Sequence, residues 1–299
     1  MTTIAQARDA ILARLIGETP RRLTTTNGVV TTTATSVTLS SALVAAQTGS
    51  LLELGQELVY ITDPSSAPSY DMIRAMYGTT AVQHSSGILA EVNPRFRAME
   101  VTSVIAEELR SWPVQLGRME TVETEVPAQQ YQATLDPTTT GEVHRLVSAD
   151  VLGVSTRDWD QQRSRIDVRL IYDRDTNQFT TGWGIQLPQR FDTVRTIQTT
   201  LITDYDLSSI GTDGTDLEGD VGLRANRLDV LYYGVMWRLM SWKEVGRTDR
   251  ASNAALDSEE VPPTHQIQVA QQLKQLRDQR LSEEVTRMYD LYPVLMSTQ

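Results

Sequence analysis

The sequence predicts an α+β fold in which β-rich modules are inserted into a helical framework. Three observations lead to this prediction. Apolar residues recur at helical spacing near the start of the chain and again through its last third. Two stretches between these parts alternate apolar and polar residues and are rich in β-branched side chains. Clusters of glycine, proline and aspartate separate the segments, as is typical of turns.

An N-terminal helix is expected over residues 1–20, and a small β module over residues 21–92. The apolar stripe of the helix consists of Ile4, Ala7, Ile11, Leu12 and Leu15. Gly17 and Pro20 end it. Strands of the β module are expected within residues 24–41, over residues 57–61 and over residues 72–76. A turn with two prolines, residues 63–68, separates the last two strands.

A central helix is expected over residues 93–113. Asn93 is a suitable N-cap, and Pro94 fits the first turn of a helix. The apolar stripe of this helix consists of Val101, Val104, Ile105 and Leu109. Trp112 and Pro113 end it.

Residues 114–210 form the second β-rich segment. Residues 165–172 alternate apolar and polar side chains over their whole length and predict one strand. Residues 196–202 predict another strand. Residues 211–223 contain Asp213, Gly214, Asp216, Gly219 and Asp220, which interrupt any periodicity, so they predict an acidic loop.

The last segment, residues 224–299, is expected to form a C-terminal helical hairpin followed by a tail. The stripe of its first helix consists of Leu228, Leu231, Val235 and Leu239. An acidic connector, residues 248–260, leads to a second, long helix that begins at Pro262–Thr264 and ends at Asp290–Pro293. Its apolar residues lie mainly on one side and are Ile267, Ala270, Leu273, Leu276, Val285 and Met288.

Composition and charge exclude several classes of protein. The 299 residues carry a formal net charge of −11, which argues against tight nucleic-acid binding, since that requires a basic face. The chain has no cysteine, so disulfides, thiolate zinc sites and cysteine nucleophiles are excluded. It lacks an apolar run of the ~20 residues that cross a bilayer, and its start does not resemble a signal peptide. We expect a protein made in the cytoplasm with no membrane partner.

The basic residues are almost all arginines. Only Lys243 and Lys274 are lysines, so 25 of the 27 basic residues are arginines. A GC-rich genome produces this bias without functional content, but arginine is also suited to bidentate carboxylate pairing at packed interfaces.

No pattern in the sequence predicts catalysis. The segment from Asp173 begins like a calcium-binding loop, but Gln178 stands where glycine is required and Gly184 where glutamate is required. Phosphate-binding loops and nucleophile elbows are absent. His84 is interpreted as a loop residue, and the pairs Glu107–Glu108 and Glu283–Glu284 as solvated helix surface. We therefore expect no catalytic, metal or cofactor site and no enzymatic activity.

Aromatic residues of the C-terminal hairpin instead predict an interface. Tyr232, Tyr233, Trp237 and Trp242 lie on several faces of one helix, and such side chains anchor protein interfaces. About half are expected to pack within the monomer and the rest to meet a neighbouring subunit. Arg277 and Arg280 of the long helix complete the candidate subunit interface.

Several motifs resemble structural proteins of tailed bacteriophages. Residues 57–61, 74–80 and 81–87, with the turn Gly78-Thr79 and the later His84 and Gly87, resemble a β module of phage necks and tails. Three further segments are similar to head-to-tail connector (adaptor, neck) proteins: residues 93–96 before a helix, residues 228–234, and residues 281–285 before Tyr289 to Pro293. The resemblance covers about half of the chain.

This resemblance implies a structural virion protein at the neck that is assembled in the host cytoplasm. Such adaptors form a homo-oligomeric ring, dodecameric by resemblance, beneath the portal protein. The ring extends the DNA channel, lets DNA pass without sequence-specific binding, and provides a docking platform for the stopper or tail-completion protein. Carried over to this chain, the candidate portal contacts are Tyr289, Tyr292, Val294, Leu295 and Met296. The candidate channel-facing residues are Asp213, Asp216, Glu218 and Asp220.

Two alternatives stay open at this point. The β module also suits another neck or tail component, such as a stopper, a baseplate protein or a receptor-binding tail protein. A metal-dependent hydrolase of the cell wall is a further alternative, although the sequence supplies no ligand cluster for it.

Overall fold

The computed structural model describes residues 2–16, 23–43, 45–137, 142–152, 163–173, 178–251 and 263–292. The chain divides into two compact units. The first unit comprises residues 1–3, 108–233 and 274–299, and the second comprises residues 4–107 and 234–273. The predicted α+β class is confirmed, because both long helices and antiparallel sheets are present.

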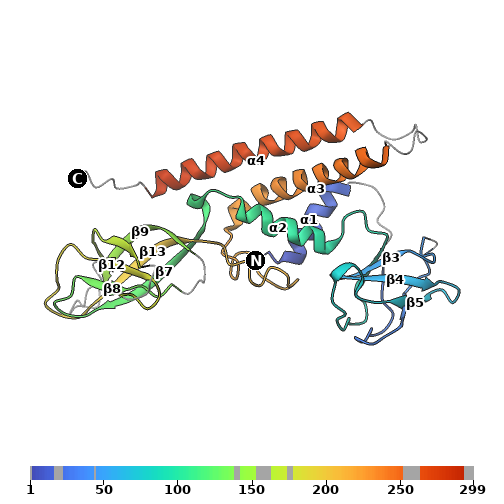
Figure 1. Cartoon of the computed structure of the whole chain (residues 1–299), viewed down its shortest axis with the longest axis horizontal. Helices are drawn as coiled ribbons and strands as arrows, with labels where there is room; N and C mark the ends of the chain where they lie inside the picture. Colours follow the sequence, from blue (N-terminus) through green and yellow to red (C-terminus); the bar gives the residue numbers. More distant parts are fainter. Residues whose placement is uncertain are drawn as a thin grey trace. The chain divides into compact units, whose positions relative to one another are not determined.

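Among the described residues, four α-helices form the helical framework (Figure 1). They are α1 (Ile4–Ile16), α2 (Ala98–Arg110), α3 (Leu228–Ala251) and α4 (Pro263–Leu291). Three short 3₁₀ helices accompany them: η1 (Met76–Gly78), η2 (Val114–Leu116) and η3 (Ala225–Arg227). The predicted C-terminal hairpin is confirmed, since α3 and α4 pack together as a pair. Within the described part of the chain, no helix is both long and apolar enough to span a membrane.

The β module, residues 23–92, is one six-stranded antiparallel sheet in the second unit. Its strands are β1 (Leu23–Thr25), β2 (Ser36–Thr38), β3 (Leu51–Leu54), β4 (Glu57–Asp63), β5 (Ser69–Ile73) and β6 (Leu89–Val92). Their order in the sheet is β1-β6-β3-β4-β5-β2. The sheet curls until its edges meet. Thr26 bridges Leu39, the Asn27 amide donates to the Thr38 carbonyl at 2.7 Å, and the Ser40 amide donates to the Thr25 carbonyl at 2.8 Å.

Alternating residues of these strands point into the β module. The buried core includes Val37, Leu39, Leu52, Leu54, Val59, Ile61, Tyr70, Met72, Ala90 and Val92. Most are β-branched or leucine side chains, which pack well on a pleated surface. The edge-to-edge hydrogen bonds satisfy backbone groups that an open sheet would leave unpaired.

The β-rich region, residues 118–203, lies in the first unit, and its described residues form two sheets. Its strands are β7 (Arg118–Val126), β8 (Gln132–Thr134), β9 (Val143–Leu152), β10 (Arg163–Arg165), β11 (Arg169–Tyr172), β12 (Trp183–Gln186) and β13 (Arg195–Thr203). One sheet has the order β10-β9-β13-β7 and the other β11-β12-β8, and every pairing is antiparallel. Their shared core includes Val122, Val126, Leu135, Ile185, Ile197 and Leu201.

The central helix begins later than predicted. Asn93 does not cap it: φ of Asn93 is 50°, and its side-chain oxygen accepts a hydrogen bond from the Leu51 amide at 2.9 Å. The helix begins at Ala98, whose amide donates to the buried carboxylate of Glu53 at 2.6 Å. A carboxylate at this end also interacts favourably with the helix dipole. The prediction was wrong because the N-terminal partner comes from β3, far away in the sequence.

The alternating stretch 165–172 is two strands rather than one. β10 ends at Arg165 and β11 begins at Arg169, and the chain passes from the first sheet to the second between them. The Ile166 amide still donates to the Ala149 carbonyl at 2.9 Å, so the change of sheet occurs after Ile166. Alternation continues through such a crossing because both strands bury one face.

The strand predicted over residues 72–76 ends at Ile73. Ala75 and Tyr77 both have φ of 55°, in the left-handed region, which stops the strand and forms the turn of η1. The predicted strand over residues 57–61 is confirmed as β4, and the strand over residues 196–202 as β13.

The apolar face of α4 is less continuous than its sequence predicts. Ala270 and Met288 are buried, as expected, together with Leu281. Ile267 and Leu276 are instead 43% and 45% exposed. The side chains of Ile267 and Leu276 are therefore not buried by other described residues.

Candidate functional site

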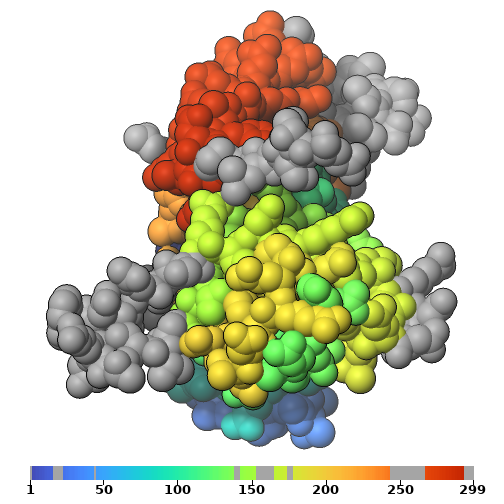
Figure 2. Space-filling view, turned by 90° about the vertical axis from the view of Figure 1, so that its left-hand side faces the viewer, coloured from blue at the N-terminus to red at the C-terminus, as the bar shows by residue number. Residues whose placement is uncertain are grey.

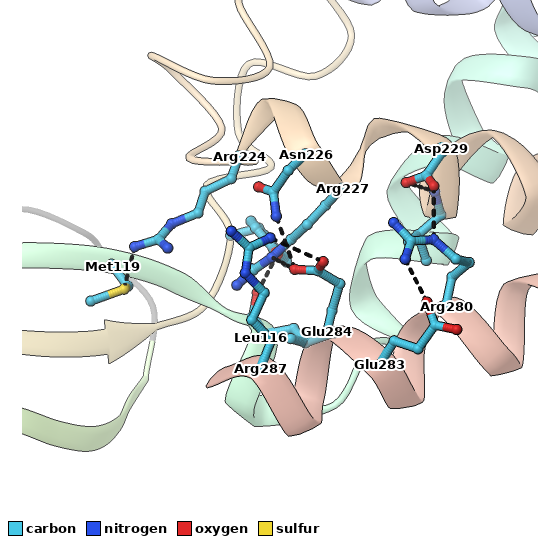
Figure 3. Close-up of polar contacts among 12 residues, drawn as sticks. Leu116, Met119, Arg224, Asn226, Arg227, Asp229, Arg280, Glu283, Glu284 and Arg287 are labelled. Atoms are coloured by element: carbon cyan, nitrogen blue, oxygen red, sulfur yellow. Dashed lines mark hydrogen bonds and ion pairs between the residues drawn. The ribbon is translucent and has the colours of Figure 1, made fainter. Parts of the chain in front are cut away.

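A cluster of charged side chains in the first unit, which we call the polar junction, includes the predicted interface residues Arg277 and Arg280. It consists of Glu108, Arg227, Asp229, Arg277, Arg280 and Glu284. These residues come from the end of α2, from η3, from the start of α3 and from α4. Figure 3 shows the part of the junction that joins η3 and α3 to α4.

Arg227 is the most deeply buried member of the polar junction, with 1% of its surface exposed. Its Nη1 donates to the Leu116 carbonyl at 2.5 Å and to the Tyr205 hydroxyl at 3.2 Å. Its Nε lies 3.8 Å from the Glu284 carboxylate, which is also buried and accepts a hydrogen bond from Asn226 at 2.9 Å. Burial raises the pKa of Tyr205, and the nearby Arg227 charge opposes part of that increase. A buried charge needs such partners, so these contacts fix α4 against η3.

Glu108 forms the second buried centre. It is fully buried, and its Oε1 accepts hydrogen bonds from Trp112 Nε1 at 2.9 Å and from Arg277 Nε at 2.6 Å. Arg277 also donates to Ser111 at 2.9 Å and to Asp278 at 2.8 Å. Burial by itself lowers the pKa of Arg277, but Asp278 and Glu108 outweigh that effect and raise it. The guanidinium therefore stays charged while it joins α4 to the end of α2.

The third part of the polar junction is more exposed. Arg280 Nε donates to Asp229 at 2.9 Å, and its Nη1 donates to Glu283 at 2.5 Å (Figure 3). Hydrogen bonds to Glu283 and Asp229 raise the pKa of Arg280. Exposed pairs of this kind contribute only about 0–1 kcal/mol each. The Arg280–Asp229 pair joins α4 to the start of α3, whereas the Arg280–Glu283 pair lies within α4.

These contacts correct one sequence interpretation. Glu108 and Glu284 were expected on solvated helix surface, but they are 0% and 5% exposed. Each meets an arginine or amide from a distant part of the chain, which compensates for its loss of hydration. Arg277 and Arg280 already have carboxylate partners within the chain, and their assignment to a subunit interface stays a prediction.

The aromatic residues of the hairpin differ in exposure. On α3, Tyr232 is buried, Tyr233 and Trp237 are half-buried, and Trp242 is 49% exposed. On α4, Tyr289 is 41% exposed and accepts a hydrogen bond from Gln115 Nε2 at 3.2 Å. Trp242 and Tyr289 are thus available to a partner, whereas Tyr232 packs within the chain.

The candidate portal contacts lie only partly within the described residues. The Tyr292 carbonyl accepts a hydrogen bond from Arg145 Nη2 at 3.0 Å, so the end of α4 is attached to β9. Val294, Leu295 and Met296 lie outside the described residues.

The acidic loop over residues 211–223 is compact. Leu217 and Val221 are buried within it. Asp216 accepts hydrogen bonds from the Glu218 and Gly219 amides at 3.2 and 3.1 Å. Asp220 accepts one from the Asp216 amide at 2.8 Å. Of the four candidate channel-facing residues, Asp216 and Asp220 therefore stabilise the loop itself, Asp213 is half-buried and Glu218 is exposed.

The N-terminus is held against the acidic loop. The Leu217 amide donates to the Thr2 carbonyl at 3.0 Å, and Thr3 forms a β-bridge with Asp216. The loop, which has no regular secondary structure, thus gains backbone partners from the first residues of the chain.

A cavity of about 440 Å³ lies beside the end of α2 and contains a histidine–carboxylate pair. His144 Nε2 lies 2.6 Å from Asp204 Oδ1, and the Asp204 side chain is 54% exposed. Ser208 also lines this cavity, but its hydroxyl donates to Asp206 at 2.6 Å rather than to the histidine. A serine nucleophile must be held beside its base, so this arrangement is not a catalytic triad.

The β module contains a buried charged cluster that the sequence did not predict. Glu57, with its side chain fully buried, accepts a hydrogen bond from Arg74 Nε at 2.8 Å and lies 2.8 Å from His84 Nε2. Burial raises the pKa of Glu57, but the hydrogen bonds from Arg74 and His84 outweigh it, and the pKa lies below its ordinary value of 4.5. His84 is a loop residue, as predicted, yet it is only 4% exposed, because its partner lies on β4.

This cluster has a structural role. Arg74 also donates to the carbonyl groups of Thr31 and Val82, and His84 forms a β-bridge with Val30. The cluster therefore holds the irregular segment 74–87 against the sheet. Within the described residues, no group of three or more histidine, aspartate or glutamate side chains is placed to hold a metal ion.

Comparison with models of known protein families finds no matching family, and comparison with curated proteins finds no match.

Proposed function

We propose that this chain is a head-to-tail adaptor of a tailed bacteriophage. In this role it forms a homo-oligomeric ring beneath the portal protein, extends the DNA channel and provides a docking platform for the stopper or tail. The motifs of residues 57–61, 74–87, 93–96 and 228–234 support the proposal by resemblance. As a virion component of the neck, the protein acts through its surfaces and without catalysis.

The observation that carries the proposal is the set of large apolar side chains exposed on α3 and α4. These are Trp242 at 49%, Ile267 at 43%, Leu276 at 45%, Tyr289 at 41% and Leu291 at 55%. Large apolar side chains that stay exposed can serve as contacts in protein–protein interfaces when they lie close together. Aromatic anchors such as Trp242 and Tyr289 often dominate the binding energy of an interface. The two helices are therefore the surface on which we place the neighbouring subunit and the portal.

The charge of the chain suits a channel wall. A net charge of −11 repels DNA, so DNA passes such a wall without adhering to it. In the acidic loop, Glu218 is the better candidate for this role, because its side chain is exposed, whereas Asp216 and Asp220 accept hydrogen bonds from loop amides.

The test is assembly of the purified chain with the portal protein of the same phage, followed by native mass spectrometry and electron microscopy. We expect a closed ring bound to the portal. Leu276→Glu combined with Leu291→Glu places charges in the exposed apolar surface and should prevent ring formation. Gln275→Glu, at an exposed neighbouring position, is the matched control and should assemble normally.

Deletion of residues 294–299 tests the portal contact in the same assay. We expect the ring to persist while portal binding is lost. A trimer that binds glycans and ignores the portal would favour a receptor-binding tail protein instead. Assembly of the double glutamate variant at the wild-type level would contradict the assignment of the helix surface.

A further inference from the structure

The β-rich region has an open groove that the adaptor proposal does not use. The groove has a volume of about 1330 Å³ and is bounded by β9 on one side and by the β10–β11 crossing and the end of β12 on the other. Ala149, Val168 and Leu187 form its buried floor. Figure 2 views the molecule from the side on which this region lies.

Two strand edges beside this groove lack a partner strand among the described residues. β10 pairs only with residues 150–152 of β9, so residues 145–148 of β9 have a partner, β13, on one side only. β11 is the edge strand of its sheet and pairs only with β12. The Asp173 amide donates to the Gly182 carbonyl, and the alternation of an antiparallel ladder then directs the backbone groups of Leu170 and Tyr172 away from β12. Such edges bind extended peptides by strand addition.

The groove is also basic, although the chain as a whole is acidic. Arg145, Arg165 and Arg169 line it together with a single carboxylate, Asp167. The side chains of Arg165 and Arg169 are exposed and have no hydrogen bond or ion pair with the described residues, whereas Arg74 of the β module and the three arginines of the polar junction are paired. Unpaired arginines beside free backbone edges favour an extended peptide that carries carboxylates.

The chain itself contains a segment of this chemistry. Residues 252–262, between α3 and α4, carry Asp257, Glu259 and Glu260 within four positions, flanked by Leu256 and Val261. Three carboxylates match the three arginines of the groove in number. The two flanking apolar side chains match its apolar floor.

We propose that the groove binds residues 252–262 of a second copy of this chain as an added strand. The contact would give the ring a second interface, separate from the exposed helix surface. This inference rests on the proposed ring, because it requires a neighbouring copy.

A peptide-binding experiment tests the groove. A fluorescent peptide of residues 252–262 is titrated into the full-length chain carrying Asp257→Asn, Glu259→Gln and Glu260→Gln, so that the resident segment does not compete. We expect binding that weakens as salt is raised. Arg165→Glu with Arg169→Glu should weaken it about tenfold or more, since like charges then face each other. Arg110→Glu, an exposed arginine outside the groove, is the matched control and should bind normally.

Charge exchange separates loss of binding from loss of folding. A peptide with arginine at positions 257, 259 and 260 should bind the variant with glutamate at positions 165 and 169 and not the unmodified groove. Equal binding of the original and the exchanged peptides to both grooves would overturn the proposal.

Cross-linking of mixed isotope-labelled and unlabelled copies tests whether the segment comes from a second copy. Cross-links between residues 252–262 and the groove should join labelled with unlabelled chains. Links found only within one chain would overturn the proposal. Portal-bound rings without peptide binding would refute the groove alone, whereas peptide binding without a portal complex would refute the adaptor proposal alone.

Discussion

The β module and the β-rich region differ in how the edge strands of their antiparallel sheets are paired. In the β module, β1 and β2 meet at the Thr26–Leu39 bridge, and the buried Glu57 carboxylate is paired with Arg74 and His84. In the β-rich region, β9 and β11 have edges without a partner strand among the described residues, and the side chains of Arg165 and Arg169 have no ion-pair partner there. The first arrangement pairs its own edges and charged side chains, whereas the second leaves strand edges and two arginine side chains without partners among the described residues.

Charged side chains have different roles in the two regions. Those of the β module are buried and stabilise the fold, whereas Arg165 and Arg169 of the β-rich region are exposed. A buried, hydrogen-bonded carboxylate costs several kcal/mol when its network is broken, because the remaining charge loses its partner. An exposed, unpaired arginine contributes little to folding and is free to bind. Stability measurements can therefore test which kind of charge each region holds.

The largest effect is expected for Glu57→Gln in the β module. The substitution keeps the shape of the side chain but leaves Arg74 buried without its carboxylate, which should cost about 3–5 kcal/mol. Hydrogen–deuterium exchange of β4 and β5 should then accelerate by roughly a hundredfold or more. Glu123→Gln on β7, an exposed position, is the matched control and should change exchange very little. Unchanged protection in Glu57→Gln would show that the charged cluster does not hold the module together.

A smaller effect is expected from acid. The pKa of Glu57 in the folded chain lies below its ordinary value of 4.5. Its contribution to stability is therefore complete above pH 4.5 and is lost as the pH falls through the lower folded-state pKa. Exchange of β4, corrected for the intrinsic pH dependence of amide exchange, should accelerate in this range. The same pH profile in Glu57→Gln would mean that another group causes the change.

The smallest effect is expected for Arg165→Leu combined with Arg169→Leu in the β-rich region. Since neither arginine is paired, the free energy of unfolding should change by no more than about 0.5 kcal/mol. Arg74→Leu in the β module should instead lower the free energy of unfolding by about 3 kcal/mol, because it leaves the Glu57 carboxylate buried without its arginine partner. Urea denaturation followed by circular dichroism compares the two. Similar losses in both variants would abolish the distinction between the regions.

The sequence predicted the elements well where periodicity decides the structure. The stripe of Ile4, Ala7 and Ile11 is buried on α1, and the strand over residues 196–202 is β13. Local patterns are sufficient there, because each element buries one face regardless of its partner.

Prediction from the sequence failed where the hydrogen-bond partner of a residue comes from a distant part of the chain. Glu108 meets Arg277 across 169 positions, and His84 meets Glu57 across 27. Each residue was interpreted from its neighbours as exposed helix surface or loop, but tertiary contacts bury both. The same applies to the start of α2, where Glu53 of β3 supplies the N-terminal partner that Asn93 was expected to provide. Hydrogen-bond partners that distant are set by topology, which periodicity does not reveal.

The attachment of the N-terminus to the acidic loop offers a landmark for locating this protein in an assembled particle. Because Thr2 and Thr3 bond to Leu217 and Asp216, a small tag fused ahead of Thr2 emerges beside residues 213–220. For the adaptor role proposed above, the tag density in tomograms of tagged virions would mark the side of the neck on which those carboxylates lie. Density inside the tube would place them along the path of the genome, and density on the outer rim would place them in solvent.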